Sequence, residues 1–259
     1  MPDLPTFLTL LGFLQLAAQA ILIIHLLRTR LSAVYPSFLF LVCASSLREA
    51  ALLALYSHPS LYATLYVATA PVTWLSYILA ALELYGKVLK GYPGISSVAR
   101  WLLIAVAPVS IVASLLLLLP EMDQTSRRFF WLMAESMITR GVCASILVFL
   151  LLLTVFLVWY PVPMNRNTVR HAFLLSTLFV VQTAALLLRD AHGYDLNRIV
   201  SVVLAVFGVM IVATWLLLLQ PAGEILQVVV RTPFNQDDER RLLEQLSALN
   251  ASLSPPGRK

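Results

Sequence analysis

Seven long, nearly uncharged apolar stretches dominate the chain and constrain its fold more than any other feature. An α-helix needs about 20 mostly apolar residues to cross the hydrocarbon core of a bilayer, and each stretch reaches or approaches that length. The stretches are continuous and leucine-rich, which favours helices over the alternating strands of a membrane barrel. They are Thr6–Leu27, Pro36–Tyr56, Tyr62–Tyr85, Val98–Leu119, Phe129–Tyr160, His171–Leu188 and Ile199–Leu219.

The composition excludes a soluble fold. Of 259 residues, 60% are hydrophobic and 12% are charged, whereas a soluble domain is roughly half apolar and about a quarter charged. A single soluble core of this size could not bury so much apolar surface. We therefore expect an all-α, polytopic transmembrane bundle of seven helices at residues 1–220, followed by a cytoplasmic tail at residues 221–259.

The Lys and Arg residues predict the orientation of the bundle. Apart from Arg48 and Arg140, twelve of them fall on one side of the predicted membrane and four on the other. Because cytoplasmic loops are enriched in positive residues, this distribution predicts the N-terminus outside and the C-terminus inside. The net charge of +5 then reflects loop bias and contact with anionic lipid headgroups rather than nucleic-acid binding. The lipid bilayer is the predicted partner, and the oligomeric state stays open.

The tail contains a predicted amphipathic helix at about 237–253. Asn235 can cap it, acidic residues occupy its first turn, and leucines recur at helical spacing. A helix this short is marginal alone in water. We therefore expect it to dock on the bundle, on the membrane or on a partner protein.

Missing motifs narrow the possible activities. The last apolar stretch has no Lys for a retinal Schiff base, and the chain has no H-E-x-x-H zinc motif, phosphate-binding Gly loop or G-x-S-x-G element. Asp190, His192 and Asp195 could ligate a cation, but three polar residues in a short loop are more typical of a solvated surface. We expect no enzyme activity, no cofactor and no metal site.

Polar residues inside the apolar stretches form the candidate site. A charge in a lipid-facing segment costs about 2.5–3.5 kcal/mol, so such residues normally face the bundle interior. Arg48 lies eight residues before Tyr56, which places it roughly 12 Å below the outer boundary. The polar residues predicted at a similar level or near mid-membrane are Arg48, Glu49, Thr73, Trp74, Glu135, Thr139, Arg140 and Gln182. We expect an outward-facing polar cavity with Arg48–Glu135 and Glu49–Arg140 as ion pairs.

Two questions about this cluster stay open at the level of sequence. Gly141–Tyr160 alone is long enough to span, so Glu135 and Arg140 could instead belong to an interfacial extension. Even a buried set of ion pairs can fix helix register without binding a ligand. In the inner half we expect no comparable polar set, and Glu83 is assigned to the interface.

One group of motifs resembles a known class of protein. Leu82-Glu83-Leu84-Tyr85 through Gly91-Tyr92-Pro93-Gly94, with Tyr35-Pro36 and Arg48-Glu49, resembles uncharacterised bacterial seven-helix membrane proteins of similar length. The resemblance extends over most of the chain and implies a bacterial inner-membrane location, without any activity or functional residue. The arrangement also resembles the membrane sensor modules of some bacterial signalling enzymes, but an output domain is not expected in this chain.

Two functions are consistent with these features. The first is a non-enzymatic sensor, receptor-like protein or scaffold, whose outer cavity binds a small molecule or nothing and whose tail contacts a partner. The second is a small-solute transporter with a three-plus-one-plus-three helix arrangement, because Leu47–Ala50 and Leu188–Ala191 are alike on helices that run the same way. An intramembrane enzyme ranks third, since no nucleophile or metal set accompanies Glu49 or Glu135.

Overall fold

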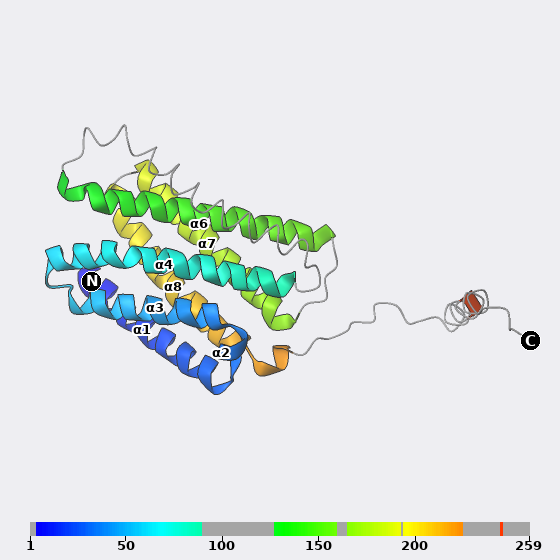
Figure 1. Ribbon diagram of the computed structural model, residues 1–259. Helices are drawn as coiled ribbons and strands as arrows, with labels where there is room; N and C mark the ends of the chain where they lie inside the picture. Colours follow the sequence, from blue (N-terminus) through cyan, green and yellow to red (C-terminus); the bar gives the residue numbers. More distant parts are fainter. Residues whose placement is uncertain (1–3, 90–126, 160–164, 193, 225–243, 246–259) are drawn as a thin grey trace, which may run out of the picture. The chain divides into compact units, whose positions relative to one another are not determined.

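Helices account for all regular structure in the described part of the chain. The computed structural model describes residues 4–89, 127–159, 165–192, 194–224 and 244–245 (Figure 1). The elements are α1 (Leu4–Arg28), α2 (Leu31–Val34), α3 (Pro36–Ala54), α4 (Pro59–Val88), α6 (Arg127–Trp159), α7 (Arg166–His192), α8 (Tyr194–Leu218) and the 3-10 turn η2 (Pro221–Glu224).

Six of these helices, all except the short α2, are long and apolar enough to cross a membrane. They coincide with six of the seven predicted stretches, so the predicted all-helical class is confirmed for them, and their length and composition are consistent with a multi-pass membrane protein. The remaining predicted span, Val98–Leu119, lies outside the described residues. So does the predicted tail helix at about 237–253, apart from Glu244 and Gln245, which are helical.

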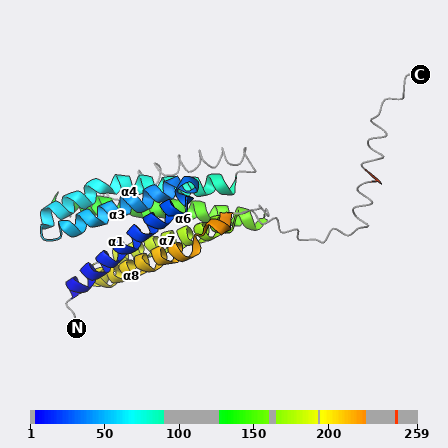
Figure 2. The ribbon, with the colours of Figure 1, turned by 90° about the horizontal axis from the view of Figure 1, so that it is seen from below.

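The chain divides into one unit of Met1–Leu226 and a second of Gln227–Lys259. Within the first unit the six long helices form a closed ring, in which neighbours pack in the order α1, α3, α4, α6, α7 and α8, and α8 returns to α1. Figures 1 and 2 show α1 and α8 side by side although they are far apart in sequence. The ring brings polar residues from distant segments to a common interior.

Helix boundaries follow from local sequence. Pro36 and Pro59 stand in the first turns of α3 and α4, where a missing backbone N–H costs nothing. Glu83 of α4 lies beside the first turn of α3, and its Oε2 accepts a 2.5 Å hydrogen bond from the backbone N–H of Ser37. The first N–H groups of a helix have no partner within it. Glu83, which was expected to lie at an interface, therefore caps α3.

Large apolar side chains cover the outside of the bundle. Leu47, Trp131, Phe173 and Leu217 are each at least 66% exposed. Apolar exposure on this scale is a liability in water but suits a surface in contact with lipid. The polar residues of interest lie on the opposite, inward-facing sides of these helices.

Candidate ligand-binding site

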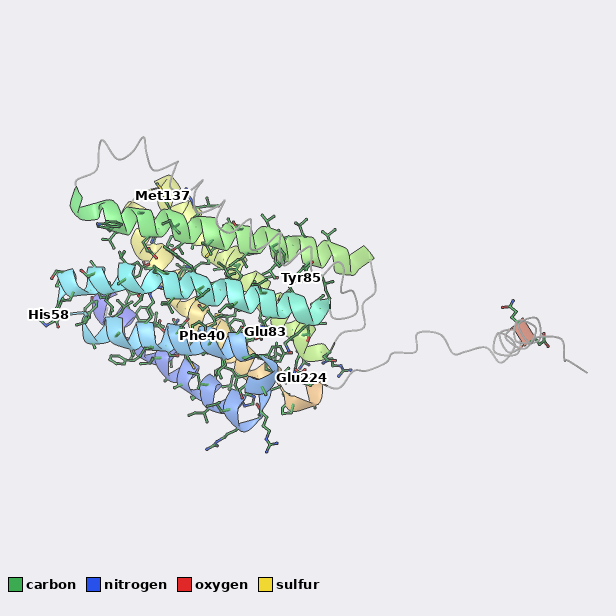
Figure 3. The ribbon with its side chains drawn as sticks, in the orientation of Figure 1. Phe40, His58, Glu83, Tyr85, Met137 and Glu224 are labelled. Carbon is green, nitrogen blue, oxygen red and sulfur yellow. The ribbon has the colours of Figure 1, made fainter. Side chains whose placement is uncertain are left out.

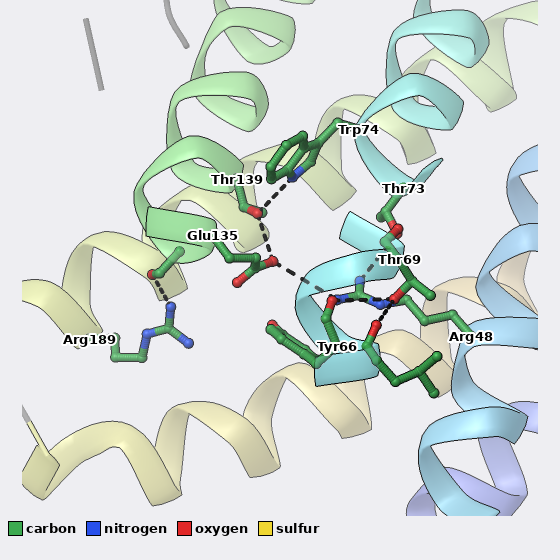
Figure 4. A network of polar contacts seen from close by, with 10 residues as sticks. Arg48, Tyr66, Thr69, Thr73, Trp74, Glu135, Thr139 and Arg189 are labelled. Atoms are coloured by element: carbon green, nitrogen blue, oxygen red, sulfur yellow. Dashed lines mark hydrogen bonds and ion pairs between the residues drawn. The ribbon is translucent and has the colours of Figure 1, made fainter. Parts of the chain in front are cut away.

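Arg48 of α3 is the centre of a polar network between α3, α4 and α6 (Figure 4). Its side chain is 18% exposed, and its Nη2 lies 3.9 Å from Oε1 of Glu135. The guanidinium also donates at 3.3 Å to Oγ1 of Thr73 and at 3.3 Å to the carbonyl oxygen of Tyr66. Its central carbon lies 4.5 Å from the centre of the Tyr66 ring. The structure therefore brings the predicted Arg48–Glu135 pair together, away from the lipid-facing surface.

Thr139 and Trp74 complete this group. Thr139 lies one helical turn after Glu135, donates at 2.9 Å to its Oε1 and accepts a 2.8 Å hydrogen bond from Nε1 of Trp74. Glu135 is 5% exposed and lies inside the candidate span Ala134–Val155. It is therefore buried within the bundle, next to the first residue of that span. We call Arg48, Tyr66, Thr73, Trp74, Glu135 and Thr139 the Arg48 network.

Glu49 turns towards α1 instead of α6. The side-chain amide of Gln19 donates a hydrogen bond to the Glu49 carboxylate. The amide oxygen of Gln19 in turn accepts a 2.8 Å hydrogen bond from the hydroxyl of Ser46. Among the contacts described, none joins Glu49 to Arg140, so the predicted second ion pair is not found there. Arg140 follows Thr139 directly, about 100° further round the helix, and it has contacts of its own.

A cavity of about 360 Å³ lies beside the Arg48 network. Its walls come from α1, α3, α4, α7 and α8, with no lining residue from α6. Of the predicted site residues, the cavity is lined by Arg48, Glu49, Thr73 and Gln182, and not by Trp74, Glu135, Thr139 or Arg140. Arg48 therefore takes part in the ion pair and also lines the cavity.

Three of the lining residues have buried polar atoms that lack a hydrogen bond within the described structure. They are Nε of Arg48, Oε2 of Glu49 and Nε1 of Trp215. A buried donor or acceptor without a partner costs about 1–3 kcal/mol, and such atoms in native proteins are normally satisfied by a ligand or an ordered water. These three atoms are a reason to treat the cavity as a binding site.

The other end of the cavity is aromatic. Phe38 and Trp215 line it, with ring centres 4.8 Å apart. Behind them lies His171, 1% exposed and 4.6 Å from Phe38 between ring centres. Along α3, Phe38 and Arg48 are separated by roughly 15 Å at helical rise. The cavity is therefore polar at one end and aromatic at the other.

A second polar region, at the α2 end of the bundle, was not predicted. Three successive carbonyl oxygens at the end of α8 accept hydrogen bonds from different side chains. They are Leu218 from Arg170 at 2.7 Å, Leu219 from His25 at 2.9 Å, and Gln220 from Asn167 at 2.6 Å. The last carbonyls of a helix lack partners within it, and these side chains supply them.

Glu224 of η2 joins the same region. Its Oε1 accepts hydrogen bonds from Tyr35 at 2.9 Å and Asn167 at 2.8 Å, and its Oε2 accepts one from Asn165 at 3.2 Å. Figure 3 shows Glu224 and Glu83 towards one end of the bundle and His58 at the other. We call His25, Tyr35, Asn165, Asn167, Arg170 and Glu224 the Glu224 network.

The Glu224 network corrects the expectation that this half contains no comparable polar set. The predicted span began at His171, whereas α7 begins at Arg166, which adds Asn167 and Arg170 to a helix rather than a loop. Asparagines at a helix start are a signal for capping, and Asn165 and Asn167 carried that signal. Their partners on η2 are more than 50 residues away in sequence, so no local pattern could identify them.

No cluster of His, Cys, Asp or Glu in the described chain has the arrangement of a metal site. The side chains of Asp190, His192 and Asp195 lie outside those described. No protein-family model matches the chain, and neither a curated protein nor a solved structure shows significant similarity to it.

Proposed function

We propose that this chain is a non-enzymatic, receptor-like membrane protein that binds a small molecule in the cavity beside Arg48. The observation that carries the proposal is the set of three buried, unpartnered atoms on Arg48, Glu49 and Trp215 in the wall of that cavity. The cavity volume of about 360 Å³ falls within the range of small-molecule sites.

A purely structural role accounts for only part of this arrangement. The Arg48–Glu135 pair could fix the register of α3 against α6, as buried ion pairs do elsewhere. Glu49, however, has no ion-pair partner among the described side chains, and register needs no cavity. A bound molecule would supply the partner that Glu49 lacks.

The orientation and location belong to the same proposal. The excess of Lys and Arg on one side supports an N-terminus outside and a C-terminus inside. The resemblance to bacterial seven-helix proteins supports the inner membrane of a bacterium. A tail helix at about 237–253 would then lie on the cytoplasmic side, where it could report occupancy of the cavity to a partner protein.

A small-solute transporter is the second candidate. On α8 the lining residues run from Leu204 to Trp215, and on α3 from Phe38 to Leu52, so the cavity includes the middle of both helices. Transporters bind their substrates near the midplane of the bilayer. The two candidates differ in access: a receptor cavity opens to one side of the membrane, whereas a transporter site is reached in turn from both.

Thiol labelling from each side of the membrane tests both candidates. Ser45 lines the cavity, and the two natural cysteines, Cys43 and Cys143, are free and can be replaced by Ala. In that background we expect Ser45→Cys to react with a membrane-impermeant methanethiosulfonate added on the N-terminal side only. Labelling from both sides would favour the transporter, and no labelling from either side would contradict both. Val203→Cys, on the exposed surface of α8, is the unreactive control.

A cavity-filling variant tests whether the reagent reaches Ser45 through the cavity. Ala205 lines it, and Ala213 lies on the same helix with its side chain exposed. We expect Ala205→Phe to slow labelling of Ser45→Cys at least tenfold and Ala213→Phe to leave it unchanged. Equal rates in the two variants would show that the reagent does not pass through this cavity.

A further inference from the structure

We propose that the ligand of the cavity is an organic ammonium ion with an apolar body, held by Glu49 at one end and by the aromatic floor at the other. The inference rests on the proposed function, because it names the class of molecule that the same cavity binds. The charges of the lining residues, their unpartnered polar atoms and the distribution of apolar side chains along the cavity support it.

The first step concerns charge. Arg48 and Glu49 are the two charged residues that line the cavity. Arg48 pairs with Glu135, which does not line the cavity and lies 3.9 Å from its Nη2. The terminal nitrogens of Arg48 also donate to Thr73 and Tyr66. Glu49 has no ion pair among the described side chains: its hydrogen-bond partner is the neutral amide of Gln19, and the neighbouring Arg48 acts on it only through its electric field. Glu49 is therefore the charged lining residue that a ligand of opposite charge could pair with.

The second step concerns hydrogen bonds. One carboxylate oxygen of Glu49 is buried and has no described partner, and a carboxylate can only accept. A ligand that satisfies it must donate, and a charged donor gives a stronger and shorter bond than a neutral one. An ammonium group supplies a charged donor for this oxygen, while the unpartnered N–H groups of Arg48 and Trp215 are left to water. A carboxylate ligand would instead face Glu49 with like charge.

The third step concerns the rest of the ligand. Beyond Glu49 the wall becomes mostly apolar towards Phe38 and Trp215, with Leu41, Ile211 and Val212 between the two ends. The polar atom there is the indole N–H of Trp215, which has no partner in the described structure. Apolar walls favour apolar ligand surface in proportion to the area removed from water. A small hydrophilic cation would leave this part of the cavity unused, whereas an alkyl or aryl amine fills it.

Three six-carbon compounds of the same length test the class. We expect n-hexylammonium to protect Ser45→Cys from labelling at concentrations at which hexanoate does not and hexanol does so only weakly. Butylammonium should be weaker than hexylammonium by about fourfold for each CH₂ removed, because each contributes burial energy in the apolar part. Direct calorimetric titration of the protein in lipid nanodiscs gives the dissociation constants.

Matched variants place the ammonium group. Glu49→Gln should weaken hexylammonium binding at least tenfold while leaving the weak binding of hexanol unchanged. Glu224→Gln is the control, since it makes the same change in a carboxylate that does not line the cavity. Hexylammonium binding that is insensitive to Glu49→Gln would overturn the proposal, as would preferred binding of hexanoate. Both results would leave the proposed function standing, because the access experiments test that separately.

Discussion

The Arg48 network and the Glu224 network are both polar clusters in an apolar bundle, but they are built from different kinds of contact. In the Glu224 network, side chains satisfy main-chain carbonyls at the end of α8, and Glu224 in turn holds the side chains. In the Arg48 network, most of the contacts join side chains of three helices at positions well inside them.

This difference distinguishes polar side chains that the fold requires from polar side chains that it does not require. Helix ends carry main-chain groups that have no partner, so polar side chains beside them are required by the fold itself. The interior of a helix makes no such demand, because its main-chain groups bond to one another. Polar residues at interior positions therefore call for another explanation. The cavity that borders Arg48, and is not lined by Glu224, points to a ligand.

The sharpest test of this distinction removes the charges of the Arg48 network. Arg48→Ala and Glu135→Ala should each destabilise the protein by about 3–5 kcal/mol, because each leaves an uncompensated buried charge. Thermal unfolding in detergent measures the loss. The double variant should lose clearly less than the sum of the single variants, since the two residues form one pair. Strictly additive losses would contradict the pairing.

A smaller effect is expected at the other region. Asn167→Ala removes hydrogen bonds to the carbonyl of Gln220 and to Glu224, and should cost about 1–3 kcal/mol because buried acceptors lose a donor. Hydrogen exchange should accelerate in η2, while labelling of Ser45→Cys should keep its rate. Thr177→Ala, which removes only an exposed bond within α7, is the neutral control. A changed labelling rate would show that the two regions are coupled.

The smallest effects come from single donors at the margins of each network. Trp74→Phe removes the indole N–H that contacts Thr139, and Tyr35→Phe removes the hydroxyl that contacts Glu224. Each should cost about 1 kcal/mol, since the remaining partners stay bonded. Chemical denaturation of both variants provides the comparison. A loss as large as that of Arg48→Ala in either variant would contradict the ranking of charge above neutral hydrogen bonds.

The membrane spans and the Arg48–Glu135 part of the site could be predicted from the sequence because both follow from the apolar character of the surrounding lipid. Hydrophobic length alone identifies membrane helices, and the cost of a charge in lipid identifies Arg48 as an interior residue. The same cost led to Glu135, which the structure places beside Arg48. These are properties of single residues in a uniform solvent, and no knowledge of neighbours is needed.

What the sequence did not predict depends on rotation and on distant partners. Arg140 is one residue from Thr139, yet one residue on a helix is about 100° of rotation, and that decides whether a side chain meets α4 or another neighbour. Gln19 was known to be polar, but its position between Ser46 and Glu49 requires the packing of α1 on α3. The capping of α8 by His25 likewise joins residues 194 positions apart.

The closure of the ring between α1 and α8 has a consequence for the biogenesis of the protein. Gln15 of α1 lies so close to Gly208 of α8 that a methyl group there would approach its amide oxygen to 2.8 Å. At roughly 5–20 residues per second, translation leaves α1 in the membrane for about 10–40 s before α8 exists. During that interval the polar side chains of α1 need temporary hydrogen-bond partners, from α3, the insertion machinery or water. Of the six long helices described, α1 is thus synthesised first and is among the last to complete its contacts.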